Sequence, residues 1–145
     1  MKNLQNYEIK NKKILFRADL NVPLLDGVIT DTSRIQAIKS SIEILISNKN
    51  KIFLMAHFGR PKGKIVDKYS LNFILPSLKE ILNLDKVYFL KNFDQGSVDK
   101  TANEMQVGNL CLIENIRFFK EEENLDLNFA KKISSLFDVY VNDAF

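Results

Sequence analysis

Cysteine is nearly absent from this chain of 145 residues, in which Cys111 carries the one thiol. A single cysteine excludes an internal disulfide and the cysteine-based metal motifs. Because it lies in the apolar segment 110–113, we expect a buried and unreactive thiol. No run of 18 or more apolar residues occurs, and the first residues lack the apolar core of a signal sequence. We therefore expect no membrane partner and a cytoplasmic location.

The chain also lacks a strong excess of either charge. Its net charge is +3, with 27% charged and 46% hydrophobic residues, which is ordinary for a soluble globular protein. This balance falls short of the basic stripe of a nucleic-acid-binding protein, and the aromatic residues fall largely on expected core positions. We expect no nucleic-acid partner. The length predicts a single domain, residues 1–145, with a core of its own.

Arginine and histidine are scarce, and their positions are informative. Beside 17 lysines the chain has four arginines and one histidine, namely Arg17, Arg34, Arg60, Arg117 and His57. The planar arginine side chain binds phosphate or carboxylate through two parallel hydrogen bonds, which lysine does not. All five residues fall just past an expected strand end or at the start of an expected helix. This placement predicts a site for a small, highly anionic ligand.

Expected strands and helices alternate along the chain. The expected strands are 13–19, 51–57, 87–90, 109–114 and 139–142. A small hairpin is expected at 24–29, where an Asp-Gly pair separates two apolar pairs. Continuous apolar strands joined by amphipathic helices predict an α/β fold. The expected architecture is a Rossmann-like parallel sheet with helices on both faces, plus the small N-terminal hairpin.

Four helices are expected between these strands. Apolar residues on one face predict a helix over 35–46, with Thr32 as its N-cap. A second helix is expected over 70–82, but Pro76 lies inside it, so either the helix begins after Ser70 or it bends at the proline. A weaker helix is expected near 98–105, and the last near 127–137.

Polar side chains gather just after the expected strands. In open α/β sheets the ligand lies beyond the carboxyl ends of the strands. The residues at those ends are Arg17, Asp19, Asn21, His57, Arg60, Glu114, Asn115, Arg117 and Asp143. We expect these distant positions to surround one cleft.

Several of these residues also have simpler interpretations. His57 alone is typical of a structural histidine at a strand end, and Asp19 alone is equally typical of a turn cap. No Gly-x-Ser-x-Gly segment supplies a nucleophile for His57, so hydrolase chemistry is not expected. The segment 59–64 is one residue short of a nucleotide phosphate loop, and Ile65 stands where Ser or Thr is required, which favours a substrate loop. Glutamates 121–123 indicate a solvated surface rather than a metal site.

Five stretches of the chain closely resemble phosphoglycerate kinase. They are RADLNVP (17–23), ITDTSRI (29–35), HFGRPKG (57–63), ENIRF (114–118) and DVYVNDAF (138–145). The resemblance covers essentially the whole chain, in the order and spacing of the family. It implies a protein with two lobes, of which the N-terminal lobe binds phosphoglycerate and the C-terminal lobe binds the nucleotide. The reaction that it implies is reversible phosphoryl transfer between 1,3-bisphosphoglycerate and ADP.

The resemblance also implies a role for each residue of the cleft. Asp19 and Asn21 would hold the hydroxyl end of the glycerate. The basic patch around its phosphate and carboxylate would consist of Arg17, His57, Arg60 and Arg117. Arg34 would bind substrate and be the catalytic residue, reaching toward the phosphoryl group in transfer. Such a reaction needs positioning and charge neutralisation more than covalent help.

The family pattern continues past Phe145 into a glycine-rich segment, a hinge helix and the nucleotide lobe. We therefore expect this chain to hold no nucleotide or metal site and to bind no cofactor, with Mg-ADP or Mg-ATP requiring a separate C-terminal lobe as partner. The expected function is the 3-phosphoglycerate and 1,3-bisphosphoglycerate binding half of a glycolytic kinase, inactive alone. The alternative is a truncated or split-gene remnant, folded and anion-binding but without catalytic activity.

Overall fold

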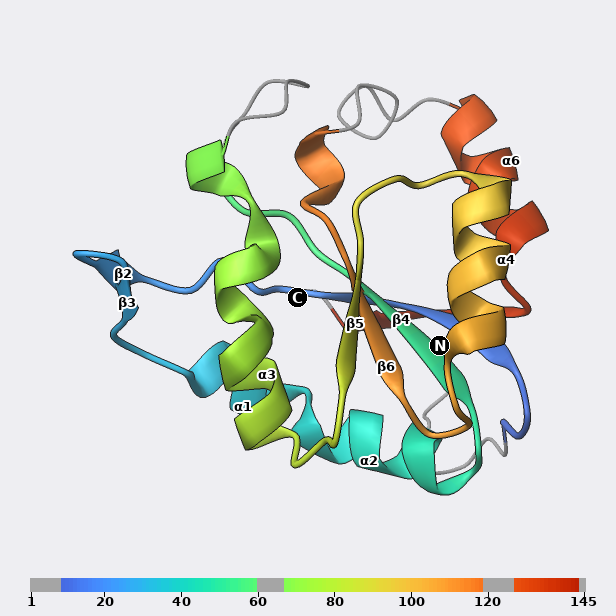
Figure 1. The fold of residues 1–145 in the computed structure, drawn as a ribbon, viewed down its shortest axis with the longest axis horizontal. Coiled ribbons are helices and arrows are strands. Elements are labelled where there is room, and N and C mark those ends of the chain that lie inside the picture. The colour runs from blue at the N-terminus through green and yellow to red at the C-terminus, as the bar shows by residue number, and fades with distance from the viewer. Residues whose placement is uncertain (1–8, 60–66, 119–126, 144–145) are drawn as a thin grey trace.

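Five parallel strands form the main sheet, in the order β5-β6-β4-β1-β7 (Figure 1). The computed structural model describes residues 9–59, 67–118 and 127–143, with no account of the side chains of 127–130 and 133. The strands are β1 Lys13–Ala18, β4 Lys51–Met55, β5 Val87–Leu90, β6 Leu110–Ile113 and β7 Val139–Asp143. Every neighbouring pair is parallel. The predicted parallel sheet is confirmed, and its strands begin and end within about two residues of the expected positions.

Helices cover both faces of this sheet, as predicted. Alternate side chains of a strand point to opposite faces. Ile14 and Phe16 of β1 pack in one cluster with the helices α1 Ser33–Ala37, α2 Lys39–Ser47 and α3 Leu75–Ile81. Leu15 packs in the other cluster, against α4 Gln95–Glu104 and the end of α6 Leu127–Leu136. Burial on both faces explains why the strands consist of continuous apolar runs.

The small hairpin forms at the predicted position. Its strands, β2 Leu24–Leu25 and β3 Val28–Ile29, pair antiparallel. The two turn residues, Asp26 and Gly27, have positive φ angles of 52° and 79°. A two-residue turn of this kind requires positive φ at both positions, which Asp-Gly adopts readily. In Figure 1 the hairpin projects away from the main sheet, just before α1.

Thr32 is the N-cap residue of α1, as predicted, but its side chain does not make the capping hydrogen bond. Its hydroxyl instead accepts from the Gln36 side-chain amide at 3.0 Å. Asp31 accepts from the Ser33 backbone N–H at 2.8 Å, and this hydrogen bond lowers the pKa of Asp31. A carboxylate one residue earlier therefore satisfies a first-turn donor. The helix expected over 35–46 is also interrupted at Ile38, between α1 and α2.

The two middle helices differ from expectation at their N-terminal ends. A 3₁₀ turn, η3 Leu71–Ile74, precedes α3, so the α-helix does begin later than Ser70. Pro76 falls in the first turn of α3, where a missing N–H breaks no hydrogen bond. Helix α4 begins at Gln95, earlier than expected, because Asp94 caps it by accepting from the Ser97 N–H at 2.8 Å.

A buried asparagine closes the amino end of the sheet. The Asn50 side chain is fully buried. Its amide donates to the carbonyls of Ile9 and Leu45 at 2.9 and 2.8 Å, and its oxygen accepts from the Lys12 N–H at 2.9 Å. These bonds join the approach to β1, the end of α2 and the start of β4. Asn50 therefore fixes backbone that the apolar core does not orient.

No helix in the described parts of the chain has the length and apolar character that crossing a membrane requires.

The thiol of Cys111 should be unreactive in the folded protein. Its side chain is fully buried in β6, and burial raises its pKa to about 12. At pH 8 the folded chain should not react with an aromatic disulfide reagent, because the thiolate is the reactive form. The same chain in urea should release one equivalent of chromophore. Rapid labelling without denaturant would contradict the burial of this strand.

Candidate functional site

The carboxyl ends of β1, β4 and β6 lie side by side because these strands are parallel neighbours in the sheet. Asp19 and Asn21 follow β1, and the loop 57–59 follows β4. A 3₁₀ turn, η4 Ile116–Phe118, carries Arg117 after β6. We call the edge formed by residues 19–21, 57–59 and 114–117 the carboxyl rim. The expected gathering of polar residues at one edge is what the structure shows.

Arg34 reaches the rim from the first turn of α1. Its guanidinium Nη1 lies 3.2 Å from Asp19 Oδ1 and also donates to the Asn21 carbonyl. Asp19 Oδ1 accepts in addition from the Asn21 N–H, at 3.0 Å. The Arg34 and Asp19 side chains are 44% and 34% exposed, so both remain accessible to a ligand. Asp19 is therefore both a turn cap and the carboxylate that orients Arg34.

The loop after β4 continues this hydrogen-bonded chain. Asn21 Oδ1 accepts from the Gly59 N–H at 3.3 Å, and the Gly59 carbonyl accepts from Arg117 Nη1 at 2.9 Å. Hydrogen bonds thus run from Arg34 through Asp19, Asn21 and Gly59 to Arg117. Four of the predicted site residues are joined in this way.

Gly59 is required by the shape of this loop. Its φ angle is +61°, in the left-handed region. A Cβ atom at this position would lie 2.4 Å from both Cδ1 and Cε1 of the Tyr69 ring. Tyr69 belongs to the 3₁₀ turn η2 Asp67–Tyr69, and its ring packs edge-on against Phe58 at a centroid distance of 6.4 Å. The ring therefore leaves no room for a side chain at position 59.

A fully buried asparagine, Asn115, lies beneath the rim. Its oxygen accepts from the backbone N–H groups of Phe58 and Arg117, both at 3.1 Å. Its amide nitrogen donates to the carbonyls of Phe58 and Tyr69, at 2.6 and 2.9 Å. One side chain thus makes four hydrogen bonds to three separate segments.

Glu114, next to Asn115, holds a further segment. Its side chain is 9% exposed and accepts three hydrogen bonds. Oε2 accepts from the Ser70 hydroxyl at 2.7 Å, while Oε1 accepts from the Leu71 N–H at 2.9 Å and the Asn115 N–H at 2.8 Å. Glu114 and Asn115 were expected at the strand ends but not among the site residues. A polar pair directly after four buried apolar residues is the signal that indicates their role.

The other predicted site residues are not among the five that the hydrogen bonds from Arg34 to Arg117 join, or are not described. Arg17 is half-buried in β1 and lies two residues after Leu15, so its side chain starts on the same face of the sheet, the one that α4 and α6 cover. Arg34 approaches from α1, on the opposite face. His57 is half-buried, two residues beyond the end of β4. Arg60 lies outside the described residues, as do glutamates 121–123 and most of the segment 59–64.

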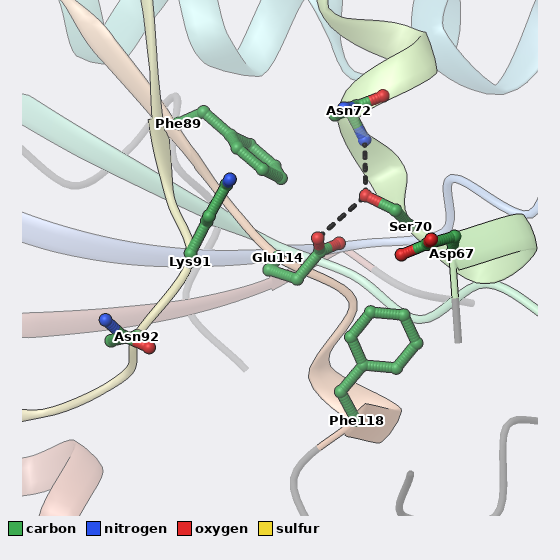
Figure 2. Close-up of a pocket in the computed structure, with 8 residues that line it drawn as sticks. All are labelled: Asp67, Ser70, Asn72, Phe89, Lys91, Asn92, Glu114 and Phe118. Carbon is green, nitrogen blue, oxygen red and sulfur yellow. Dashed lines mark hydrogen bonds between the residues drawn. The ribbon is translucent and has the colours of Figure 1, made fainter. Parts of the chain in front are cut away.

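A cavity of about 350 Å³ opens beside the rim, at the ends of β5 and β6. Figure 2 shows the residues that line it, namely Asp67, Ser70, Asn72, Phe89, Lys91, Asn92, Glu114 and Phe118. None of the predicted site residues that the structure describes is among them. The Glu114 carboxylate in its wall is bonded to Ser70, so it supports the neighbouring rim. The guanidinium groups of Arg34 and Arg117 contact the rim, and within the described residues no arginine lines this cavity.

The charges of the rim suit an anion that also carries a hydroxyl group. Arg34 and Arg117 supply planar donors, and Asp19 and Asn21 supply acceptors beside them. Asp143 ends β7 at the same edge, and burial raises its pKa. Within the described ranges no three His, Cys, Asp or Glu side chains cluster as metal ligands. Donors and acceptors that lie side by side can together orient a small anion that carries a hydroxyl group.

Comparison with known proteins gives one family. The sequence model of the phosphoglycerate kinase family matches residues 4–145. The phosphoglycerate kinase of Wolbachia pipientis is 41% identical over 143 residues, which are 99% of this chain and 35% of that protein. That of Finegoldia magna is 42% identical over 146 residues, covering 99% of this chain and 37% of that protein. The chain spans about a third of the length of the curated relatives it matches.

Solved structures agree with the sequence comparison. The structure of phosphoglycerate kinase from Coxiella burnetii matches with a TM-score of 0.82 and 30% identity, over 97% of this chain and 34% of that chain. The phosphoglycerate kinase of Pyrococcus horikoshii matches with a TM-score of 0.83 and 28% identity, over 99% of this chain and 36% of that chain. The fold described above is thus shared with part of each protein.

Substitution of Gly59 by alanine should destabilise the fold more than the same change at Gly27. Both glycines have positive φ, but a Cβ at Gly27 meets nothing within 4 Å, whereas one at Gly59 meets the Tyr69 ring. Gly27→Ala carries only the backbone cost, about 1–2 kcal/mol. Gly59→Ala adds the clash, and the added part should disappear in a Tyr69→Ala background. Urea unfolding measures both, and equal losses for the two glycines would contradict the packing of the rim.

Proposed function

The chain belongs to the phosphoglycerate kinase family, and on that premise we propose that it forms the substrate-binding lobe of such an enzyme. Its ligands would be 3-phosphoglycerate and 1,3-bisphosphoglycerate. In the assembled enzyme a phosphoryl group would pass reversibly between 1,3-bisphosphoglycerate and ADP. We further propose that residues 1–145 act as one domain.

The observation that carries this proposal is the hydrogen-bonded chain from Arg34 to Arg117. Its members come from four segments, and Gly59 lies 38 residues from Asn21 and 58 residues from Arg117 in sequence. A purely structural rim would not need arginine at both ends, since backbone and amide bonds already close the loops. Two guanidinium groups beside a carboxylate and an amide match a ligand with anionic ends and a hydroxyl between them.

The roles follow from the chemistry of each group. Asp19 and Asn21 would accept hydrogen bonds from the glycerate hydroxyl. At Asp19 the accepting atom would be Oδ2, because Oδ1 contacts Arg34. Arg117 would bind the anionic groups with the guanidinium donors that Gly59 does not use. The remaining members of the proposed basic patch are Arg17, His57 and Arg60, the last outside the described residues.

Arg34 is the proposed catalytic residue. Transfer spreads negative charge over the phosphoryl oxygens, and a fixed guanidinium stabilises that charge without reorganising. The contact with Asp19 orients Arg34 before substrate arrives, while its partial exposure lets it reach a ligand at the rim. Because Arg34 lies in the first turn of α1, directly after the hairpin, it would approach the ligand from a different element than the loops after β1, β4 and β6.

We place the magnesium ion and the nucleotide on the other lobe of the enzyme. The described residues offer no cluster of metal ligands, and the predicted substrate loop 59–64 departs from the nucleotide phosphate-loop spacing. No step of the proposal is assigned to a metal in this chain. The alternative is a folded anion-binding module that has no catalytic activity of its own.

Calorimetric titration of the 145-residue chain with 3-phosphoglycerate tests the proposed ligand. We expect saturable binding, and Arg117→Ala should weaken it about tenfold to a hundredfold, because a hydrogen bond to a charged group contributes about 1.5–3 kcal/mol. Lys86→Ala is the matched control, since it removes an exposed positive charge just before β5, at the amino end of the sheet. Absence of heat at millimolar ligand, or equal losses for the two variants, would refute the proposed site.

Arg34→Lys tests the catalytic role in an enzyme that has both lobes. Lysine keeps the charge and can still pair with Asp19, but it loses the planar fork that matches the phosphoryl oxygens. A well-placed arginine contributes roughly 10³–10⁵ in rate, so kcat should fall by a large factor within that range while KM changes little. A coupled assay of ATP-dependent 3-phosphoglycerate phosphorylation measures both. A rise in KM with kcat unchanged would contradict the assignment, since only uniform binding of substrate and transition state would then be lost.

A further inference from the structure

We propose that Asn115 is a positioning residue for the anion site, because it locks the loop 57–59 and Arg117 into one rigid unit. The inference rests on the function proposed above. Asn115 does not reach the ligand itself, since its side chain is fully buried and all four of its hydrogen bonds go to backbone. It acts through the two segments that carry His57 and Arg117.

The Phe58 backbone is held at both of its polar groups. Asn115 accepts from the Phe58 N–H at 3.1 Å and donates to the Phe58 carbonyl at 2.6 Å. On the other side of His57, the Ala56 carbonyl accepts from the Ile116 N–H at 3.0 Å. The residues on both sides of His57, Ala56 and Phe58, are therefore hydrogen-bonded to the segment after β6. The position of the imidazole can then change mainly by rotation of the side chain.

Arg117 is fixed by the same side chain. Its N–H donates to the Asn115 oxygen at 3.1 Å, and its Nη1 donates to the Gly59 carbonyl at 2.9 Å. The Gly59 carbonyl that accepts that bond directly follows Phe58, whose backbone N–H and carbonyl are both bonded to Asn115. Loss of the Asn115 amide would thus loosen both ends of the Arg117 side chain together.

Only an amide fits this position. Asn115 accepts two hydrogen bonds with its oxygen and donates two with its nitrogen. Aspartate would place an acceptor against the carbonyls of Phe58 and Tyr69, and leucine would satisfy none of the four groups. The bond to the Tyr69 carbonyl also holds the residue whose ring leaves room only for glycine at position 59. The Asn115 side chain therefore holds both the loop itself and the residue that packs against it.

Asn50 offers a matched control within the same chain. Like Asn115 it is fully buried and bridges three backbone segments through its side-chain amide. It lies at the amino end of the sheet, next to the start of β4, whereas Asn115 lies beyond the carboxyl end of β6. Removing either amide should destabilise the fold, but only Asn115 contacts the segments of the rim.

The test compares Asn115→Ala with Asn50→Ala in the 145-residue chain. Urea unfolding gives stability, and calorimetry with 3-phosphoglycerate gives affinity under conditions where each variant is fully folded. Both variants should be less stable than the wild type. Asn115→Ala should bind about tenfold to a hundredfold more weakly, the range seen when supporting hydrogen-bond partners of ligating groups are removed elsewhere, and Asn50→Ala should bind as the wild type does.

The possible results separate this inference from the function on which it rests. If the wild type binds and Asn115→Ala binds equally well, or if Asn50→Ala loses as much affinity, the positioning role is overturned and the proposed function stands. If the wild type does not bind, the proposed function fails and this inference fails with it. Should Asn115→Ala not fold, Asn115→Ser supplies the comparison. In an Arg117→Ala background the added loss from the Asn115 substitution should shrink, which a merely structural role would not produce.

Discussion

All five strands of the main sheet run in the same direction, and the candidate site depends on this constraint. A parallel connection must carry the chain back across a face of the sheet, so every strand delivers its next segment to the same edge. Asn21, Gly59 and Arg117 become neighbours for this reason, although 38 and 58 residues separate them in sequence. Antiparallel pairing of β1 with β4 would send two of these segments to opposite edges.

Apolar burial holds the sheet between its helices, but it does not orient the loops at its edges, because the hydrophobic effect is not directional. Two buried asparagines orient these loops through hydrogen bonds, Asn50 at the amino end of the sheet and Asn115 beyond its carboxyl end. Each satisfies backbone groups that would otherwise be buried without partners, which is costly in a medium of low dielectric. At the carboxyl end, the bonded groups adjoin the residues that carry positive charge. The same physics that completes the fold at one edge therefore shapes the candidate site at the other.

The sequence predicts those features that depend on local chemistry. Continuous apolar runs predict parallel strands because both faces of each strand are buried, and Asp26-Gly27 predicts the hairpin because both residues tolerate positive φ. The N-cap position at Thr32 was predicted correctly, but the bond to the first turn comes from the neighbouring Asp31 carboxylate. The supporting role of Glu114 and Asn115 could not be read locally, since their partners Leu71 and Phe58 lie 43 and 57 residues away. The rim residues were predicted by position, whereas their connections arise only from tertiary structure.

We expect the segments after β1, β4 and β6 to contact one ligand together. Amide chemical shifts of the isotopically labelled chain, followed by NMR during titration with 3-phosphoglycerate, would reveal such a shared contact. Asn21, Gly59 and Arg117 should then shift together with one common dissociation constant, and Asn50 and Lys86 should not shift. Shifts confined to the amino end of the sheet, or different dissociation constants for the three segments, would contradict the shared contact.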